Sequence, residues 1–275
     1  MAIPLPVTHI RPGSRGVRFT LREAWLAREL LFFLVWRDVK VRYKQTVLGV
    51  AWAVVQPLLG MVVFTLFFGR LADMPSDGVP YPLFSFAALV PWTYFASAVT
   101  AGAASLAASR YLIAKVFFPR LFVPLAAVTM PAVDMAIALG MMFVLLAVYG
   151  HMPPPAVLLL PLLIAYLMLL AFSLTLWMSA LSVQYRDMRY LLPFAVQILL
   201  FLTPVAYPAS LIPDRWRLLY FLNPMSAVVE GFRAVLLGTP GPGPLLFASV
   251  AVTLVLLVGG LFYFRSVEST LVDLL

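Results

Sequence analysis

The stretch WRDVKVRYKQTVLGVAWAVVQPLLGMVVFTLFFG, residues 36–69, decides the fold class. Its first nine residues hold four cations and one carboxylate, and the 25 residues that follow, 45–69, carry no charge. An uncharged apolar segment of this length can cross the ~30 Å hydrocarbon core of a bilayer as a helix. Because cationic flanks stay on the cytoplasmic side, we expect this first crossing to run from inside to outside.

The composition of the whole chain also indicates a membrane protein. Of its 275 residues, 63% are hydrophobic and only 11% are charged, which cannot make a soluble surface. Without cysteine there are no thiolate metal sites, and His9 and His151 fall on a tail and a loop, so we expect no metal site. The net charge of +8 comes from cations beside apolar segments, which favours anionic lipid headgroups over nucleic acid as partners.

Charge-poor spans recur along the chain and predict an all-α integral membrane protein with six crossings. They are residues 45–69, 81–109, 121–150, 153–185, 190–213 and 245–264. An even number of crossings places both termini in the cytoplasm, and this puts 15 of the 19 Lys and Arg residues inside, as the positive-inside rule requires. We therefore expect a cytoplasmic tail at 1–20, a six-helix domain at 45–264 and a second cytoplasmic tail at 265–275.

Residues 21–44 predict an amphipathic helix that precedes the first crossing. Apolar residues recur on one stripe, and cations gather around another face. Aromatic residues opposite cations suit a helix in the headgroup plane, and the alternative is a packed helix of a soluble N-terminal domain. The residues singled out on this helix are Trp36, Arg37, Asp38, Arg42 and Tyr43.

The region 207–243, between the fifth and sixth crossings, has too few apolar residues to span. Asn223 followed by proline predicts a helix start, Gly238 predicts its end, and Glu230 and Arg233 lie three residues apart. We interpret this region as a re-entrant hairpin that dips into the outer leaflet. The alternative is an amphipathic helix that lies on the surface.

Three parts of the chain resemble the membrane subunit of bacterial ABC exporters for lipid-linked polysaccharides, the O-antigen and teichoic-acid class. They are residues 36–58, with the pattern Arg-Asp-x-x-x-Arg-Tyr-x-x-Thr-x-Leu-Gly-x-x-Trp, residues 79–82 with 90–92, and residues 222–225 with 230–233. The resemblance implies a homodimer in the inner membrane, two copies of a separate ATPase that hold ATP and Mg²⁺, and a polyprenyl-diphosphate-linked polysaccharide as cargo. It also implies the re-entrant hairpin.

The chain itself lacks the signature of an ATP site or an ion-coupled pump. It has no Gly-x-x-x-x-Gly-Lys-Ser/Thr motif, and none of its lysines follows a glycine. Asp134 is a single carboxylate deep in a crossing, whereas proton relays need several ionisable groups. We expect it to be hydrogen-bonded between helices, with contact to cargo as the alternative. The chain is thus expected to be a transport subunit, not an enzyme, with no cofactor of its own.

The loop after the second crossing, 109–120, mixes cations with aromatic residues. The resemblance implies that it is the coupling helix that sits in a cleft of the ATPase, and the alternative is an ordinary interfacial anchor. The residues concerned are Arg110, Tyr111, Lys115, Phe117, Phe118 and Arg120.

Aromatic rings near the outer ends of crossings are candidates for a polysaccharide pathway, because the C–H faces of sugars stack on them. These candidates are Tyr81, Trp92, Tyr94, Phe95 and Tyr207. The competing interpretation is the aromatic belt found at membrane interfaces.

Two other functions stay open on sequence alone. One is an ABC exporter for a small apolar compound such as a drug. The other, from a different class, is a membrane-embedded lipid-modifying enzyme, which would need a cluster of His, Asp or Glu at the membrane interface; the sequence offers only isolated Asp134.

Overall fold

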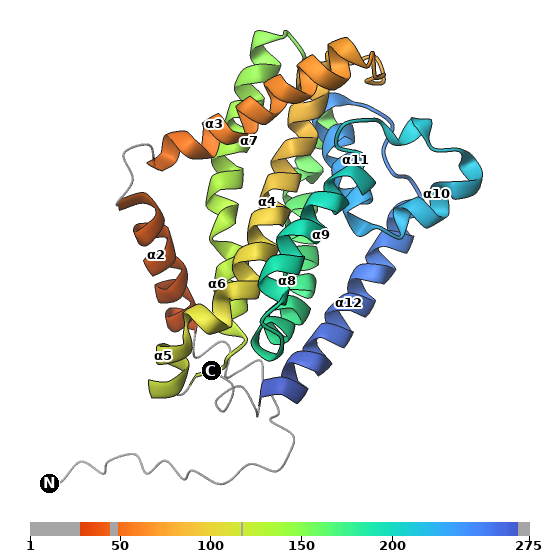
Figure 1. Ribbon diagram of the computed structural model, residues 1–275. Coiled ribbons are helices and arrows are strands. Elements are labelled where there is room, and N and C mark those ends of the chain that lie inside the picture. The colour runs from red at the N-terminus through yellow and green to blue at the C-terminus, as the bar shows by residue number, and fades with distance from the viewer. Residues whose placement is uncertain (1–27, 45–48, 117, 269–275) are drawn as a thin grey trace, which may run out of the picture.

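The computed structural model describes residues 28–44, 49–116 and 118–268, and these are helical almost throughout (Figure 1). No strand occurs within these three ranges. The elements are α2 (Arg28–Lys44), α3 (Gly49–Phe64), the π-helix η1 (Thr65–Leu71), α4 (Tyr81–Ala108), α5 (Arg110–Lys115), α6 (Phe122–Thr129), α7 (Pro131–Val148), the 3-10 helix η2 (Pro155–Leu159), α8 (Leu160–Gln184), α9 (Met188–Leu202), the 3-10 turn η3 (Ala209–Leu211), α10 (Asp214–Phe221), α11 (Pro224–Leu237) and α12 (Leu245–Glu268).

Five helical segments of the described chain are long and apolar enough to cross a membrane. They are Ala51–Leu71, Tyr81–Ala108, Phe122–Val148, Pro155–Gln184 and Leu245–Glu268. They coincide with five of the six expected crossings, so the prediction of an all-α integral membrane protein with several spans is confirmed. We call the end of the bundle that holds α5 the inner end and the opposite end the outer end, after the predicted orientation.

The fifth expected crossing, 190–213, is shorter than predicted. Helix α9 ends at Leu202 because Thr203 precedes Pro204, and a residue before proline is driven out of the helical region. Thr203 accordingly has φ −104° and ψ 144°. Its hydroxyl accepts a hydrogen bond from the Asn223 amide at 3.0 Å. The chain therefore turns back into the protein well before residue 213.

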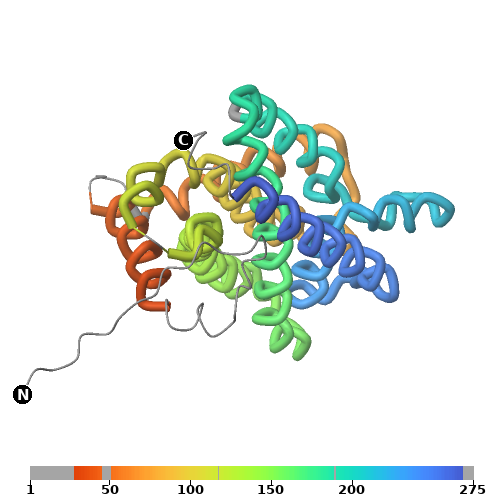
Figure 2. The backbone as a smooth tube through the Cα atoms, turned by 90° about the horizontal axis from the view of Figure 1, so that it is seen from below, coloured from red at the N-terminus to blue at the C-terminus, as the bar shows by residue number. Residues whose placement is uncertain are grey.

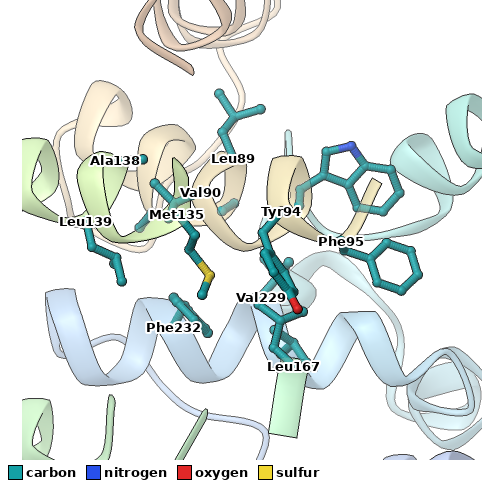
Figure 3. Close-up of a cluster of buried hydrophobic side chains, with 14 of the residues drawn as sticks. Leu89, Val90, Tyr94, Phe95, Met135, Ala138, Leu139, Leu167, Val229 and Phe232 are labelled. Carbon is teal, nitrogen blue, oxygen red and sulfur yellow. The ribbon is translucent and has the colours of Figure 1, made fainter. Parts of the chain in front are cut away.

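Helix α4 is the centre of the bundle, and most of its surface is buried. It contacts α3, α6, α7, α8 and α11. A helix that is hydrophobic all round can be buried all round, and the sequence of α4 has this character. Close packing depends on Gly102, since a Cβ there would lie 2.2 Å from the Thr175 side chain of α8. Figure 3 shows Met135, Leu167, Val229 and Phe232 gathered beneath Val90 and Tyr94 of α4.

Helix α11 is buried on nearly every side, between α4, α8 and α12 at the outer end. The Asn223 side chain caps its first turn by accepting from the Met225 N–H, and Gly238 ends it with φ 74°. The predicted start and end of this helix are thus confirmed. The burial excludes the alternative in which α11 lies on the surface, whereas the exposed helix α10 projects from the bundle (Figures 1 and 2).

Helix α2 leans against α6 at the side of the bundle opposite α10 (Figure 2). Its predicted first part, 21–27, lies outside the described residues. Leu34 is buried against the protein, while Phe32 and Trp36 are exposed and stack at 6.3 Å between ring centres. The expected separation of aromatics from cations was wrong at one point, because Lys40 lies one turn from Trp36 and its Nζ is 5.2 Å from that ring.

Candidate functional site

The outer end is held together by the side chain of Arg233, which is fully buried. Its guanidinium donates to Glu230 Oε1 at 3.0 Å. It also donates at 2.8–3.4 Å to three backbone carbonyls, those of Phe84, Val205 and Tyr207. The guanidinium carbon lies 3.4 Å from the centre of the Phe84 ring. A guanidinium can form this many hydrogen bonds because it carries five N–H donors on one planar group. Arg233 thereby connects α11 to the start of α4 and to the segment after α9.

Two tyrosines predicted for the pathway belong to the same outer network. The Tyr81 hydroxyl donates to the Ala206 carbonyl at 2.6 Å, and the Tyr220 hydroxyl donates to the Tyr207 hydroxyl at 3.0 Å. The Tyr81 ring also packs on Gly69 of η1, where a Cβ would come within 2.8 Å of the ring. Tyr81 therefore connects the start of α4 to the segment after α9, and Tyr207 connects that segment to α10.

Four of the five aromatic residues predicted to line a pathway are buried inside the protein: Tyr81, Trp92, Tyr94 and Phe95. Trp92 packs on Phe95 with ring centres 5.8 Å apart, and the Tyr94 hydroxyl donates to the Val128 carbonyl at 3.1 Å. Their burial excludes a lipid-facing aromatic belt for these four rings. Their contact with cargo stays a prediction.

A cavity of about 500 Å³ lies between α2, α3, α4 and α7, beside the middle of α4. Tyr94 borders it, together with apolar side chains of α4 and α7. The polar residues of its lining, with Trp52, are Arg42, Gln56, Thr93, Ser97 and Asp134.

Asp134 connects α7 to the C-terminal end of α2 at the edge of this cavity. The Tyr43 hydroxyl donates to its Oδ1, and Arg42 Nη2 lies 2.6 Å from its Oδ2. Burial and, after it, the hydrogen bond to Asp134 together raise the pKa of Tyr43 to about 12, so the phenol keeps the proton that it donates. The prediction that Asp134 is hydrogen-bonded between helices is confirmed.

The remaining predicted residues of α2 make only local contacts. Arg37 pairs with Asp38 at 2.8 Å, and both side chains are partly exposed. An exposed pair of this kind contributes about 0–1 kcal/mol. Of the five residues predicted on this helix, Arg42 and Tyr43 are therefore the ones that contact another helix through Asp134.

At the inner end, α5 presents an exposed pair of side chains. The Arg110 guanidinium lies 4.7 Å from the centre of the Tyr111 ring, and Tyr111 and Lys115 are exposed. Phe118, in contrast, is buried with Phe122, so its expected role as an exposed docking residue was wrong. The Phe118 ring packs into this apolar cluster because burial removes its apolar surface from water.

Phe117 and Arg120 are the two remaining predicted residues of this loop. Phe117 lies outside the described residues. Arg120 donates to the Glu268 carbonyl at the end of α12 and so joins the loop to the last helix. Within the described ranges, no group of three His, Asp or Glu side chains is placed to hold a metal ion.

Sequence reasoning missed the uncharged polar residues of the cavity lining, Gln56, Thr93 and Ser97. Thr93 and Ser97 lie one turn apart on α4, and Trp52 and Gln56 lie one turn apart on α3. Such i,i+4 spacing of polar groups within apolar helices was a usable signal, because polar side chains in membrane helices turn to protein or to a water-filled space. That the two pairs line the same cavity is a non-local feature and had no signal.

The sequence of the chain is similar to those of known membrane transport proteins. The family profile of the ABC-2 type transporter matches residues 29–237. The chain is 32% identical over 254 residues, 90% of its length and 96% of the relative's, to the O-antigen export system permease protein RfbA of Myxococcus xanthus. It is 28% identical to a Klebsiella pneumoniae protein of the same name, over 74% of this chain and 79% of that one. It is 23% identical to the polysialic acid transport protein KpsM of Escherichia coli, over 86% and 92%. The chain therefore belongs to the ABC-2 type transporter family.

Proposed function

We propose that this chain is the transmembrane subunit of an exporter that carries a polyprenyl-diphosphate-linked polysaccharide out of the cytoplasm across the bacterial inner membrane. One observation carries the proposal, the match over 90% of this chain to a relative named for O-antigen export. A relative named for transport of polysialic acid, also a polysaccharide, supports the same class of cargo. Both termini of the chain lie in the cytoplasm, as the charge distribution favours.

Energy comes from two copies of a separate ATPase. Membership of the ABC-2 type transporter family supports an ATPase partner, and the printed sequence contains no phosphate-binding loop of its own. The exposed Tyr111, with Arg110 and Lys115 on the same short helix, is the contact that receives this partner. A buried aromatic at such an interface contributes more than a charge at its rim.

Two copies of the chain form the exporter. Helix α3, the π-helix η1 that continues it, and helix α9 expose large apolar side chains, among them Leu59, Phe67, Phe194 and Phe201. Such faces suit either lipid or a second copy of the same helices.

The test is removal of the gene from a strain that makes a surface polysaccharide. We expect the glycan to disappear from the cell surface and its lipid-linked form to accumulate inside, with recovery when this chain is supplied on a plasmid. Surface glycan is measured on intact cells, and the lipid-linked form in a solvent extract. Unchanged surface glycan together with a changed tolerance to apolar drugs would replace this function with export of a small compound.

A further inference from the structure

Three polar side chains that line the cavity between α2, α3, α4 and α7 have hydrogen-bonding groups without a partner among the described residues. Within the described part of the chain, the Gln56 amide and the Thr93 and Ser97 hydroxyls make no side-chain hydrogen bond. In a membrane interior, polar groups without partners are costly, so a ligand or water is expected to meet them. The volume of about 500 Å³ is within the range of about 300–1,000 Å³ that small-ligand sites occupy.

These groups come from regular faces of two helices. Val90, Thr93, Tyr94 and Ser97 follow the spacing i, i+3, i+4, i+7, so they lie on one face of α4. On α3, Trp52 and Gln56 are one turn apart. The cavity is therefore bounded by an aromatic residue and an amide on one wall and by two hydroxyls on the facing wall.

The charge of the cavity argues against an anion as its ligand. The charged residues of the lining are Arg42 and Asp134, and they pair with each other at 2.6 Å. A phosphate placed near Arg42 would also meet the oxygens of Asp134, so the pair offers no net attraction for it. A neutral ligand with several hydroxyl groups has no such conflict and can both donate and accept.

We propose that this cavity binds one uncharged sugar ring of the exported glycan. Gln56, Thr93 and Ser97 hydrogen-bond to hydroxyls at the edge of the ring, because an amide and two hydroxyls can each donate and accept. Trp52 packs on the apolar C–H face of the ring. The Tyr43 and Arg42 bonds to Asp134 hold the end of α2 beside the cavity. This inference rests on the proposed function, since it takes the cargo to be a glycan.

The test places a photoreactive benzoylphenylalanine at Ala53, which lines the cavity, and in a second variant at Val255, an exposed position of α12. Both variants of the full chain replace the wild type in cells that export the glycan. After illumination the chain is purified and stained for periodate-sensitive sugar. We expect a glycan adduct from Ala53 and none from Val255. An Ala53 adduct that contains only phospholipid would overturn the proposal.

Hydrogen-bonding groups are then removed in the Ala53 background. Thr93→Val keeps the shape of the side chain, and the matched control is Thr100→Val, two turns further along the same face of α4 and outside the cavity. Loss of one hydrogen bond should lower the adduct yield about fivefold, and Gln56→Leu with Thr93→Val should lower it further. Thr100→Val should leave the yield unchanged at equal membrane abundance. An unchanged yield in the double variant would refute the sugar site.

Failure of this site and failure of the proposed function give different results. If deletion of the gene leaves surface glycan intact, the proposed function itself is wrong. If deletion abolishes surface glycan but the Ala53 position gives no glycan adduct, the exporter assignment stands and only the cavity proposal is lost.

Discussion

Arg233→Met should be the most damaging single substitution at the outer end. Methionine keeps an unbranched apolar stem but removes the guanidinium, which pairs with Glu230 at 3.0 Å and donates hydrogen bonds to three backbone carbonyls. Removing one member of a buried ion pair costs about 3–5 kcal/mol, and a buried acceptor without a donor adds about 1–3 kcal/mol. We expect a loss of about 4 kcal/mol or more, a large share of the roughly 5–15 kcal/mol of an ordinary domain.

The control for this substitution is Arg217→Met. Arg217 pairs with Asp214 at 3.1 Å with the same i,i+3 spacing, but both side chains are exposed. An exposed pair contributes about 0–1 kcal/mol, so this variant should behave like the wild type. The assay is the temperature at which detergent-purified protein loses its monodisperse peak in size-exclusion chromatography, together with its abundance in membranes.

A second substitution tests the cause of the loss. In Arg233→Met the carboxylate of Glu230 is left buried without its cation, so adding Glu230→Gln removes that charge and should recover part of the stability. The reasoning is refuted if Arg233→Met melts at the wild-type temperature, or if the double variant is no more stable than Arg233→Met alone.

Three further predictions follow from the structure and can be checked in cells. The sequence has no cysteine, so single cysteines placed at the exposed positions Ser210 and Ser266 report on topology. An impermeant thiol reagent should label Ser210→Cys from outside the cell and leave Ser266→Cys unlabelled. The opposite labelling pattern would show that the orientation is the reverse of the predicted one. Asp134→Asn should keep an acceptor for the Tyr43 hydroxyl and retain most export. Asp134→Leu removes the carboxylate that Arg42 and Tyr43 share and should lower the abundance of the protein in membranes. Equal abundance of the two variants would speak against the Tyr43–Asp134 hydrogen bond as a structural link between α2 and α7. Tyr111→Ala should weaken pull-down of the ATPase although the variant is present in membranes at normal abundance. Phe118→Ala leaves a cavity at a buried site and should lower the free energy of unfolding by about 3–5 kcal/mol, which reduces the amount of folded protein. Normal pull-down by Tyr111→Ala would show that this ring is not part of the contact with the ATPase.

Local sequence signals predicted the helices but not the long-range contacts between them. Runs of apolar residues located five crossings, and Asn223 and Gly238 located α11, because spanning length and helix caps depend on neighbouring residues alone. The end of α9 was also open to prediction, since Pro204 restricts the residue before it. The contacts between Arg233 and Phe84 and between Tyr43 and Asp134 join residues 149 and 91 positions apart, and no spacing rule reports on them.

The same limit explains the role wrongly expected for Phe118. Neither Phe118 nor the aromatic residues of α4 carry a sequence mark that separates a ring exposed to a partner from a ring packed on its own chain. Their burial depends on where α6, α8 and α11 pack, and a single sequence does not contain that information. The grouping of the polar residues around one cavity was missed for the same reason, because Gln56 and Thr93 line the same space only when α3 lies against α4.

Export is tested most directly in inverted membrane vesicles that contain this chain, its ATPase partner and lipid-linked glycan. The measurement is the amount of glycan that becomes protected from a glycosidase added outside the vesicles. The account predicts protection that requires both ATP and this chain. Equal protection in vesicles without this chain would contradict the account.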